Sequence, residues 1–251
     1  MRLKDRVAII TGGSRGIGRA IASAFAQEGA KVAIVSRDKA RCDKAADEIC
    51  KNGGVAIGIQ ADVSKEADAV RIIKTTKDKF QRIDILVNNA AVNLPYRSVI
   101  ELTLDEWNWV VGVNLTGTFL CSRAVLPEMM AQRRGKIINM SSSGGRRGAA
   151  GRVPYRPTKA AVISFTECLA AEVKPYNIDV NAICPGAVET DMMREITGGK
   201  MPEYLMPPED IAAVAVFLAS DESKSITGTA IDTYGASNPL FGVGTSVSKP
   251  K

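Results

Sequence analysis

The chain has 251 residues, which is enough for one domain with a buried core and too few for two catalytic domains joined by a linker. Hydrophobic residues make up 45% and charged residues 24%, a composition that excludes a disordered or fibrous protein. The net charge of +6 is spread without a block of Lys and Arg, so nucleic acid is not an expected partner. We therefore expect one domain over residues 1–251.

Histidine is absent from the sequence, and its absence removes several classes of active site. Nucleophilic schemes that need a Ser-His or Cys-His pair are excluded, as are zinc and iron sites built on histidine. The five cysteines include no C-x-x-C pair, so we expect reduced thiols and no metal site. Proton transfer must then use Tyr, Lys, Asp, Glu or Cys.

Targeting and membrane segments are not apparent. The amino terminus lacks the apolar region of a signal peptide. The longest apolar run, Ile211 to Ala219, is about half the length that crosses a bilayer. We expect a cytoplasmic protein with no membrane partner.

Short, nearly continuous hydrophobic runs alternate along the chain with longer segments that are apolar on a helical period. The runs are typical of strands covered on both faces. Their alternation with helices predicts a doubly wound α/β fold, a Rossmann fold with a parallel sheet of about seven strands and helices on both faces. Strands are expected at residues 7–10, 31–36, 55–61, 83–88, 136–140, 178–184 and 229–233. Helices are expected at residues 17–28, 39–51, 65–81, 104–133, 155–174 and 208–220.

The segment TGGSRGIG, residues 11–18, joins the first predicted strand to the first helix. Its glycines allow a tight turn, close approach of the backbone to a pyrophosphate and close packing of helix on strand, and the helix start offers free N–H groups. Because ligands of doubly wound sheets bind at the carboxyl ends of the strands, the segment predicts a dinucleotide site. The residues of this loop expected to bind the cofactor are Gly12, Ser14, Arg15, Gly16, Ile17 and Gly18.

Further motifs follow in an order that matches one family. They are NNAA at residues 88–91, VNLTG around Asn114, the serines of NMSSSGG, YRPTK at 155–159 and PGAVET at 185–190. With the G-x-x-x-G-x-G loop, these motifs cover almost the whole chain and resemble the short-chain dehydrogenases/reductases, in particular 3-oxoacyl-[acyl-carrier-protein] reductase-like and carbonyl reductase-like members. The resemblance implies an oxidoreductase that transfers a hydride between a nicotinamide and a carbonyl or secondary alcohol.

The end of the second predicted strand, VSRDK, bears on the choice of dinucleotide. An acidic residue at this place binds the ribose 2′-hydroxyl, whereas Arg accommodates a 2′-phosphate. Ser36 stands where an NAD-preferring relative would carry Asp, and Arg37 follows it. We therefore expect NADP (NADPH), with Arg15 approaching the same phosphate. The alternative is that Asp38 binds the ribose, which would make NAD the cofactor.

The resemblance implies cofactor contacts after the later strands as well. Asp62 resembles the residue that contacts the adenine, with Val63 packing on the ring, and Asp62 would alternatively cap the next helix. The segment 185–190 would cover the nicotinamide. Residues 191–206 would then form a short substrate lid with a Gly-Gly hinge. The other expected contacts are Asn89, Ala90, Tyr155, Lys159, Pro185, Gly186, Val188 and Thr190.

Tyr155 and Lys159 are four residues apart, so on a helix they lie on one face. An ammonium beside a phenol favours the phenolate and would lower the pKa of Tyr155 toward neutral pH, as an acid/base tyrosine requires. The alternative is a solvated helix face. Because Pro157 fits a helix only in its first turn, the helix should begin near Val153 or Pro154.

The resemblance also assigns the remaining catalytic roles. Ser142 would donate a hydrogen bond to the substrate oxygen, and Asn114 would orient a water that contacts Lys159. Asn114 would alternatively satisfy a helix bend. Tyr155 would exchange a proton with the substrate oxygen while the nicotinamide exchanges the hydride.

Arginines crowd the segment that begins after Ser142 and continues past Tyr155; they are Arg146, Arg147, Arg152 and Arg156. They predict an anionic substrate, such as a 3-oxoacyl thioester, a sugar acid or a small keto compound. Alternatively, the arginines lie on a solvated rim or at a subunit interface of the expected homo-oligomer, a homotetramer or dimer. The residues expected to contact substrate are Tyr96, Arg97, Arg147 and Arg152.

Three other functions stay open. They are an NAD-dependent sugar or polyol alcohol dehydrogenase, a non-catalytic dinucleotide-sensing Rossmann protein, and a sugar-nucleotide epimerase. The epimerase would need a larger carboxyl-terminal domain, and the Asn, Ser, Tyr and Lys set argues against the sensor. The tail, residues 237–251, departs from the family's glycine-rich ending, which puts the tetramer contact often made there in doubt.

Overall fold

Seven parallel strands form one sheet in the computed structural model, which describes residues 1–201 and 204–235. The strand order, β3-β2-β1-β4-β5-β6-β7, reverses direction between β1 and β4, so the crossovers run outward on both sides of that point. The doubly wound fold predicted from the sequence is confirmed. The strands are β1 (Val7–Thr11), β2 (Lys31–Ser36), β3 (Val55–Gln60), β4 (Ile85–Asn88), β5 (Gly135–Met140), β6 (Ile178–Pro185) and β7 (Ala230–Thr233).

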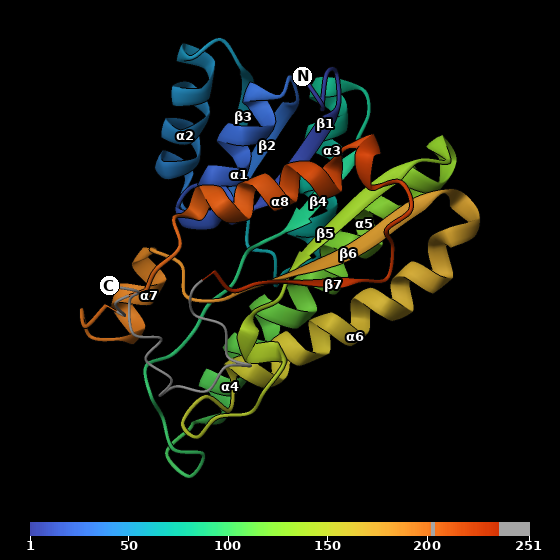
Figure 1. Ribbon diagram of the computed structural model, residues 1–251. Helices are drawn as coiled ribbons and strands as arrows, with labels where there is room; N and C mark the ends of the chain where they lie inside the picture. The colour runs from blue at the N-terminus through green and yellow to red at the C-terminus, as the bar shows by residue number, and fades with distance from the viewer. Residues whose placement is uncertain (202–203, 236–251) are drawn as a thin grey trace, which may run out of the picture.

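Helices cover both faces of the sheet, as Figure 1 shows: α1, α2 and α8 pack on one face and α3, α5 and α6 on the other. The α-helices are α1 (Gly16–Gln27), α2 (Lys39–Lys51), α3 (Glu66–Phe80), α4 (Leu104–Val111), α5 (Gly117–Gln132), α6 (Tyr155–Val173), α7 (Asp191–Ile196) and α8 (Pro208–Ala219). Short helical turns are η1 (Gly112–Thr116), η2 (Ser143–Gly145), η3 (Lys174–Tyr176) and η4 (Asp221–Ser223).

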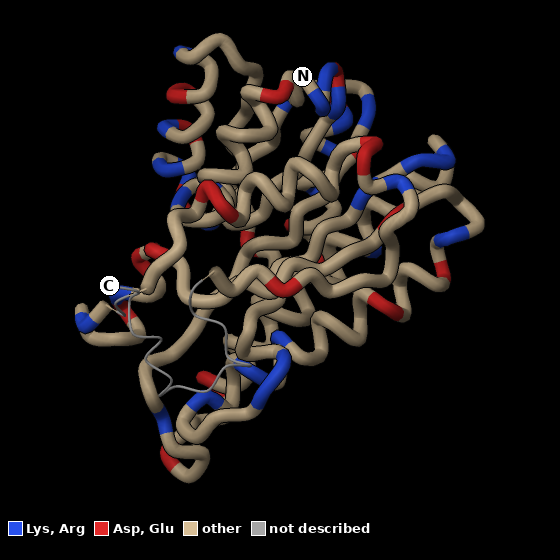
Figure 2. Tube along the Cα trace, in the orientation of Figure 1, with Lys and Arg blue, Asp and Glu red and all other residues tan. Residues whose placement is uncertain are grey.

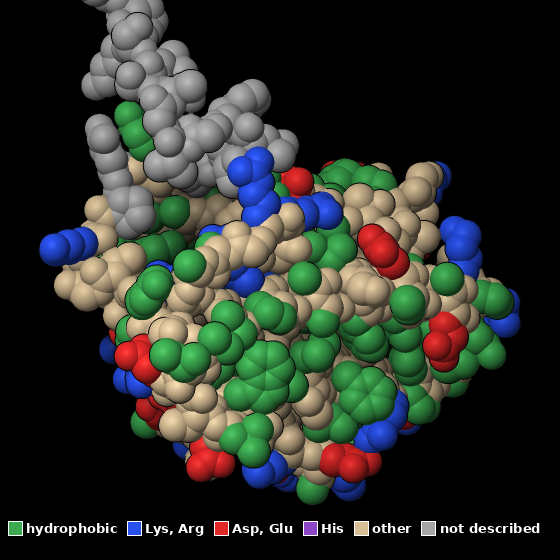
Figure 3. Space-filling view, turned by 90° about the horizontal axis from the view of Figure 1, so that it is seen from below, with side chains coloured by type: hydrophobic (Ala, Val, Ile, Leu, Met, Phe, Trp, Pro, Cys, Tyr) green, Lys and Arg blue, Asp and Glu red, His purple; other side chains and the backbone are tan. Residues whose placement is uncertain are grey.

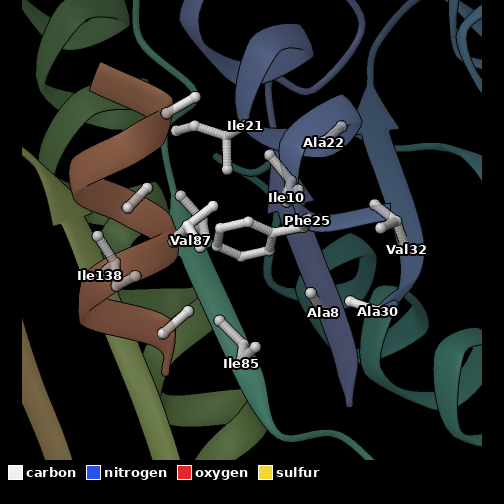
Figure 4. Packing of buried hydrophobic residues seen from close by; sticks show 14 of the residues in the cluster. Ala8, Ile10, Ile21, Ala22, Phe25, Ala30, Val32, Ile85, Val87 and Ile138 are labelled. Carbon is white, nitrogen blue, oxygen red and sulfur yellow. The ribbon is translucent and has the colours of Figure 1, made fainter. Parts of the chain in front are cut away.

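The core follows from the alternation of side chains along each strand. In β1, Ile10 points to the face covered by α1, whereas Ile9 points to the face covered by α3 and α5. Phe25 of α1 lies beside Ile10 and Val87 (Figure 4) and is fully buried. Burial of a side chain of this size stabilises the fold by roughly 1.5–3 kcal/mol. The packed layers therefore hold the carboxyl ends of the strands in fixed positions.

The single helix expected over residues 104–133 is interrupted. The structure has α4, then one π-helical turn, η1, and then α5. By length and composition alone Leu104–Gln132 could cross a membrane, and half of its most apolar window is buried. Val125 and Met129 of α5 pack into the core, as in a helix that covers a sheet.

Pro157 is the third residue of α6, so its ring lies in the first turn, where proline is tolerated. The helix begins at Tyr155 with Pro154 as its cap, one or two residues later than predicted. The tail predicted at residues 237–251 lies outside the described residues.

Candidate active site

A cavity of about 470 Å³ lies at the carboxyl ends of the strands. The loops that follow β1, β2, β3, β4, β5 and β6 all contribute to its wall. Every residue predicted to bind the cofactor lines this cavity, and so do three of the predicted catalytic residues, Ser142, Tyr155 and Lys159. Asn114 is not part of the wall and is buried behind it. One cavity thus joins the phosphate loop to the Tyr and Lys of α6.

The loop after β1 is shaped to receive a pyrophosphate. Gly12 has a φ of +64°, in the left-handed region that favours glycine. A Cβ at Gly18 would lie 2.3 Å from the carbonyl oxygen of Gly12, so only glycine lets the helix approach the loop this closely. Arg15 caps α1 without a side-chain hydrogen bond, and no acidic residue stands in the first turn. The free N–H groups at the start of α1 fit a phosphate.

Hydrogen bonds tie this loop to the end of β4. Asn89 Nδ2 donates to the carbonyl oxygens of Thr11 (2.9 Å) and Gly12 (3.2 Å). Thr11 Oγ1 accepts from the amides of Asn89 and Ala90, both at 3.0 Å. The side chain of Asn89 therefore braces the point where strand order reverses, and Asn89 also lines the cavity.

Arg37 and Asp38, the two residues that follow β2, differ in their surroundings. Arg37 lines the cavity and is exposed. Asp38 is not part of the wall, because its carboxylate caps α2 by accepting from Arg41 N (3.0 Å) and pairs with Arg41 Nε (3.1 Å). Ser36 Oγ hydrogen-bonds the backbone of Asp38. The carboxylate of Asp38 is thus occupied by contacts at the start of α2.

Arg15 and Asp62 also line this end of the cavity. Arg15, which is expected to approach the same phosphate as Arg37, pairs through its guanidinium with Asp191 (3.4 Å) and Glu195 (3.2 Å) of α7. Asp62 does not cap α3, whose cap is Lys65. Instead Asp62 Oδ1 accepts from the amide and hydroxyl of Ser64, at 3.0 and 2.7 Å.

Tyr155 and Lys159 occupy the first turn of α6. The Lys159 ammonium lies 5.6 Å from the centre of the Tyr155 ring and donates to the carbonyl oxygen of Met140 at 2.7 Å. Burial lowers the pKa of Lys159 to about 8. Burial also raises the pKa of Tyr155, and a hydrogen bond with Ser142 and the charge of Arg156 oppose this rise.

The pKa of Tyr155 is therefore raised, and the expectation that Lys159 lowers it is wrong. Desolvation of the phenol outweighs the nearby charges, and the ammonium is directed to a backbone carbonyl instead of the phenol oxygen. The phenol is consequently protonated at neutral pH, the form in which it can act as an acid.

The three serines after β5 differ in their surroundings. Ser141 is buried and donates its hydroxyl to the carbonyl oxygen of Lys159 at 2.7 Å. Ser142 Oγ accepts from the amide of Gly144 at 3.0 Å and faces the cavity beside Tyr155. The hydroxyl of Ser142 is thus placed to meet a substrate oxygen next to the phenol.

Asn114 lies in the π-helical turn η1 and is 1% exposed. Its carboxamide exchanges two hydrogen bonds with the backbone of Val92, at 2.8 and 2.9 Å, and Nδ2 also reaches Thr158 Oγ1 at 3.3 Å. The backbone carbonyl of Asn114 accepts from Thr118 Oγ1 at 2.9 Å, as at a helix irregularity. Asn114 therefore holds the loop after β4 against α6, the helix of Tyr155 and Lys159.

Of the four residues predicted to contact substrate, Arg152 lines the cavity and the other three do not. Tyr96 is 66% exposed and its ring covers Gly151. Arg97 Nη2 pairs with Glu106 at 3.1 Å, and Arg147 is exposed. The structure therefore places these three side chains outside the cavity wall. Arg156, the last arginine of the segment singled out in the sequence, also lines the cavity.

The base of the predicted lid is closed by a short bridge. Val188 pairs with Met206, and the backbone amides of Glu189 and Met206 each donate across it at 2.9 Å. Between these ends lie α7, whose apolar residues face the cavity, and two glycines with positive φ. Sequence patterns did not identify the apolar lining of α7, which consists of Met192, Met193 and Ile196.

Comparisons to known proteins agree with the fold. A family model described as short chain dehydrogenase matches residues 6–200. The chain is 39% identical over 240 residues to a 3-oxoacyl-[acyl-carrier-protein] reductase of Synechocystis sp., covering 93% of this chain and 97% of that protein. It is 36% identical over 248 residues to 2-(S)-hydroxypropyl-CoM dehydrogenase 3 of Xanthobacter autotrophicus, covering 93% and 97%.

Solved structures are similar over the same extent. The 3-ketoacyl-(acyl-carrier-protein) reductase from Brucella melitensis, complexed with NADH, matches with a TM-score of 0.88 and 36% identity over 94% of this chain and 99% of that one. The protein gox2181 matches with a TM-score of 0.89 and 29% identity. The chain therefore belongs to the short-chain dehydrogenase family and is an NAD(P)-dependent oxidoreductase that acts on C=O and CH–OH groups.

Proposed function

We propose that the chain reduces the carbonyl group of a 3-oxoacyl-type compound with NADPH, with Tyr155 as the proton donor. The observation that carries this proposal is the single cavity lined by Tyr155, Ser142 and the glycine-rich loop. In it, a dinucleotide on the loop and a carbonyl beside the phenol would lie in one enclosed space. The names of the relatives, several of them 3-oxoacyl-[acyl-carrier-protein] reductases, support the choice of substrate class.

The chain's own groups would polarise and protonate the substrate. A bound nicotinamide dinucleotide supplies the hydride. Ser142 would donate a hydrogen bond to the carbonyl oxygen, which stabilises the negative charge that develops there. Tyr155 would pass its phenolic proton to the same oxygen, and its raised pKa keeps that proton in place at neutral pH. The Lys159 ammonium, close to the ring, would stabilise the phenolate that remains.

Preference for NADPH over NADH is part of the proposal. Arg37 faces the cavity at the end of β2, where a 2′-phosphate would lie. Asp38, the residue that would favour NAD, is engaged by Arg41 and the start of α2. The other cofactor contacts would be the residues predicted from the sequence, all of which line the cavity.

Steady-state oxidation of NADPH and of NADH with 3-oxobutanoyl-CoA tests this function. We expect turnover, with a higher kcat/KM for NADPH than for NADH. If NADPH binds and no substrate in a panel of ketones and thioesters is reduced, the chain is a dinucleotide sensor. If kcat/KM is equal for the two cofactors, the proposed role of Arg37 is wrong.

We also propose a cytoplasmic homo-oligomer. Hydrophobic side chains gather on the face seen in Figure 3, which views the molecule from the side of α4 in Figure 1. Large hydrophobic side chains on and before α4 and α5 are exposed, and exposed apolar patches of this kind often mark protein interfaces. They are Val99, Ile100, Leu104, Trp109 and Phe119. Sedimentation equilibrium of the purified protein measures the oligomeric state directly.

A further inference from the structure

Two arginines at the start of α6 lack acidic partners. None of the ion pairs within residues 1–201 and 204–235 includes Arg152 or Arg156. Other arginines of this region are paired: Arg15 with two acids of α7, Arg97 with Glu106 and Arg146 with Asp232. Figure 2 shows the blue segments of this region in the lower part of the molecule, near α4. Both guanidiniums line the catalytic cavity together with Tyr155, whereas Arg37, which lines it and likewise has no ion pair among the described residues, follows β2 on the cofactor side.

The backbone places these two side chains together. The amide of Arg156 donates to the carbonyl oxygen of Arg152 at 3.1 Å, so the two residues stand one helical turn apart. Arg152 precedes α6, and this turn brings its charge close to that of Arg156; like charges one turn apart are unfavourable. Burial and the charge of Arg152 lower the pKa of Arg156, which supports their proximity. An anion between them would remove the repulsion.

The position at a helix start increases the electrostatic cost. The N-terminus of a helix carries partial positive charge, so cations there are unfavourable and anions favourable. The first turn of α6 contains no acidic residue. Both arginines are only partly exposed, which reduces the screening that water provides.

Neutral hydrogen bonds orient the guanidiniums without neutralising them. Arg156 Nη1 donates to the carbonyl oxygens of Arg147 (2.8 Å) and Gly148 (3.0 Å). Its stem lies over Gly144, where a Cβ would be 3.1 Å from Arg156 Cγ. Arg152 Nη1 donates to the carbonyl oxygen of Leu94 at 3.3 Å. The remaining N–H groups of both side chains donate to no acceptor among the described residues and are available to a ligand.

We propose that Arg152 and Arg156 form an anion subsite of the catalytic cavity, and that the substrate carries a carboxylate a few bonds from its reacting carbonyl. This inference rests on the proposed reductase function, since it describes the same cavity. Tyr155 stands between the two arginines in sequence, and all three residues line the cavity. The charge of Arg156 is close enough to the phenol to oppose the rise of its pKa. A carboxylate bound by the pair would hold the neighbouring carbonyl beside Tyr155 and Ser142.

A matched pair of probes tests the subsite: 3-oxobutanoate and its neutral isostere 3-oxobutanamide, each with saturating NADPH. We expect a lower KM for the acid in the unsubstituted enzyme. Arg152→Gln should raise the KM for the acid by about ten- to hundredfold, the scale of one lost charge-assisted hydrogen bond, and leave the KM for the amide unchanged. The KM of Arg152→Lys for the acid should lie between those of the unsubstituted enzyme and Arg152→Gln, because Lys keeps the charge and lacks the planar guanidinium.

Arg147→Gln is the control, since Arg147 lies on the same loop, is exposed and lies outside the cavity. It should leave both KM values unchanged, and the melting temperature of each variant is measured alongside. Equal KM values for acid and amide in the unsubstituted enzyme would overturn the proposal. So would an equal rise for both probes in Arg152→Gln, which would assign the arginine to loop structure through Leu94.

Calorimetry separates this proposal from the reductase function. Malonate, which carries no ketone, is titrated into the NADP-loaded protein and its Arg152→Gln variant. If malonate binds and the substitution weakens its binding at least tenfold, the subsite is supported. If, in addition, neither keto probe nor 3-oxobutanoyl-CoA is reduced, only the reductase function is rejected. Absence of malonate binding by the unsubstituted protein would overturn the subsite. Rapid reduction of the CoA thioester with no preference for the acid probe would leave the function standing and also overturn the subsite.

Discussion

The cofactor half and the substrate half of the cavity are built differently. On the cofactor side, most wall residues lie at the end of a strand or in the turn and helix start that follow it, and short local motifs place them: the turn after β1, the end of β2 and the loop after β4. On the substrate side, the wall comes from α7 and the segment before α6, which are positioned by contacts between distant parts of the chain. Cofactor binding is thus encoded locally, whereas substrate binding depends on how separate loops meet.

Tyr155→Phe tests the boundary between these halves and has the largest expected effect. The ring still packs in the first turn of α6 and only the proton donor is lost, so kcat should fall at least ~10²-fold while the Kd for NADPH stays nearly unchanged. Tyr176→Phe is the control, because Tyr176 lies in η3 beyond the other end of α6 and outside the cavity. A kcat close to that of the unsubstituted enzyme would reject the acid role of Tyr155.

The burial of Lys159 predicts how the free energy of unfolding depends on pH. The pKa of its side chain is about 8 in the folded protein against 10.5 for the exposed group, a difference that corresponds to about 3 kcal/mol. Between these two pH values the unfolded chain holds the proton that the folded chain has released, so the free energy of unfolding rises with pH. The free energies of unfolding of the cofactor-free protein and of Lys159→Met, measured with urea and plotted against pH, should diverge by about this amount between these two pH values. Parallel curves would contradict the burial of the charge.

Arg37→Ala sharpens the comparison on the cofactor side. It should weaken NADPH binding by about ten- to hundredfold and spare NADH, because charge-assisted hydrogen bonds to one phosphate are lost. Ser36→Asp should act in the same direction by adding a carboxylate for the ribose. Lys44→Ala is the control, since Lys44 is an exposed cation of α2 that lies outside the cavity. Equal weakening of both cofactors would assign Arg37 to loop structure.

The smallest expected effect concerns the contact between the two halves. Arg15 of the phosphate loop pairs with Asp191 and Glu195 of α7. Replacing both acids, Asp191→Asn with Glu195→Gln, should free Arg15 for the 2′-phosphate and strengthen NADPH binding by up to about fivefold, and less at high salt. Glu189→Gln, whose partner is Arg194, is the control. Unchanged or weaker NADPH binding at low salt would show that Arg15 does not reach the phosphate.

How much the sequence could predict follows the same division. Gly12 and Gly18 were identifiable because their roles depend on residues a few positions away, and the strands were identifiable because burial on both faces leaves continuous hydrophobic runs. The π-helical turn that holds Asn114 carries no comparable signal. The sequence around Arg147 and Arg152 does not indicate which of them lines the cavity. The fold of their loop leaves Arg147 exposed outside the cavity and places Arg152 in its wall. The pKa of Tyr155 depends on burial, which helical spacing does not reveal.

Isotope transfer tests the central claim, that one cavity joins the dinucleotide to a carbonyl protonated by Tyr155. NADPH carrying deuterium on the transferable position is oxidised with 3-oxobutanoyl-CoA, and the product is analysed by mass spectrometry. We predict one deuterium at the former carbonyl carbon, and none at that carbon when unlabelled NADPH is used in deuterated water. Two results would contradict the account. One is a product without deuterium whichever face of the nicotinamide ring carries the label, and the other is deuterium from the solvent on the former carbonyl carbon.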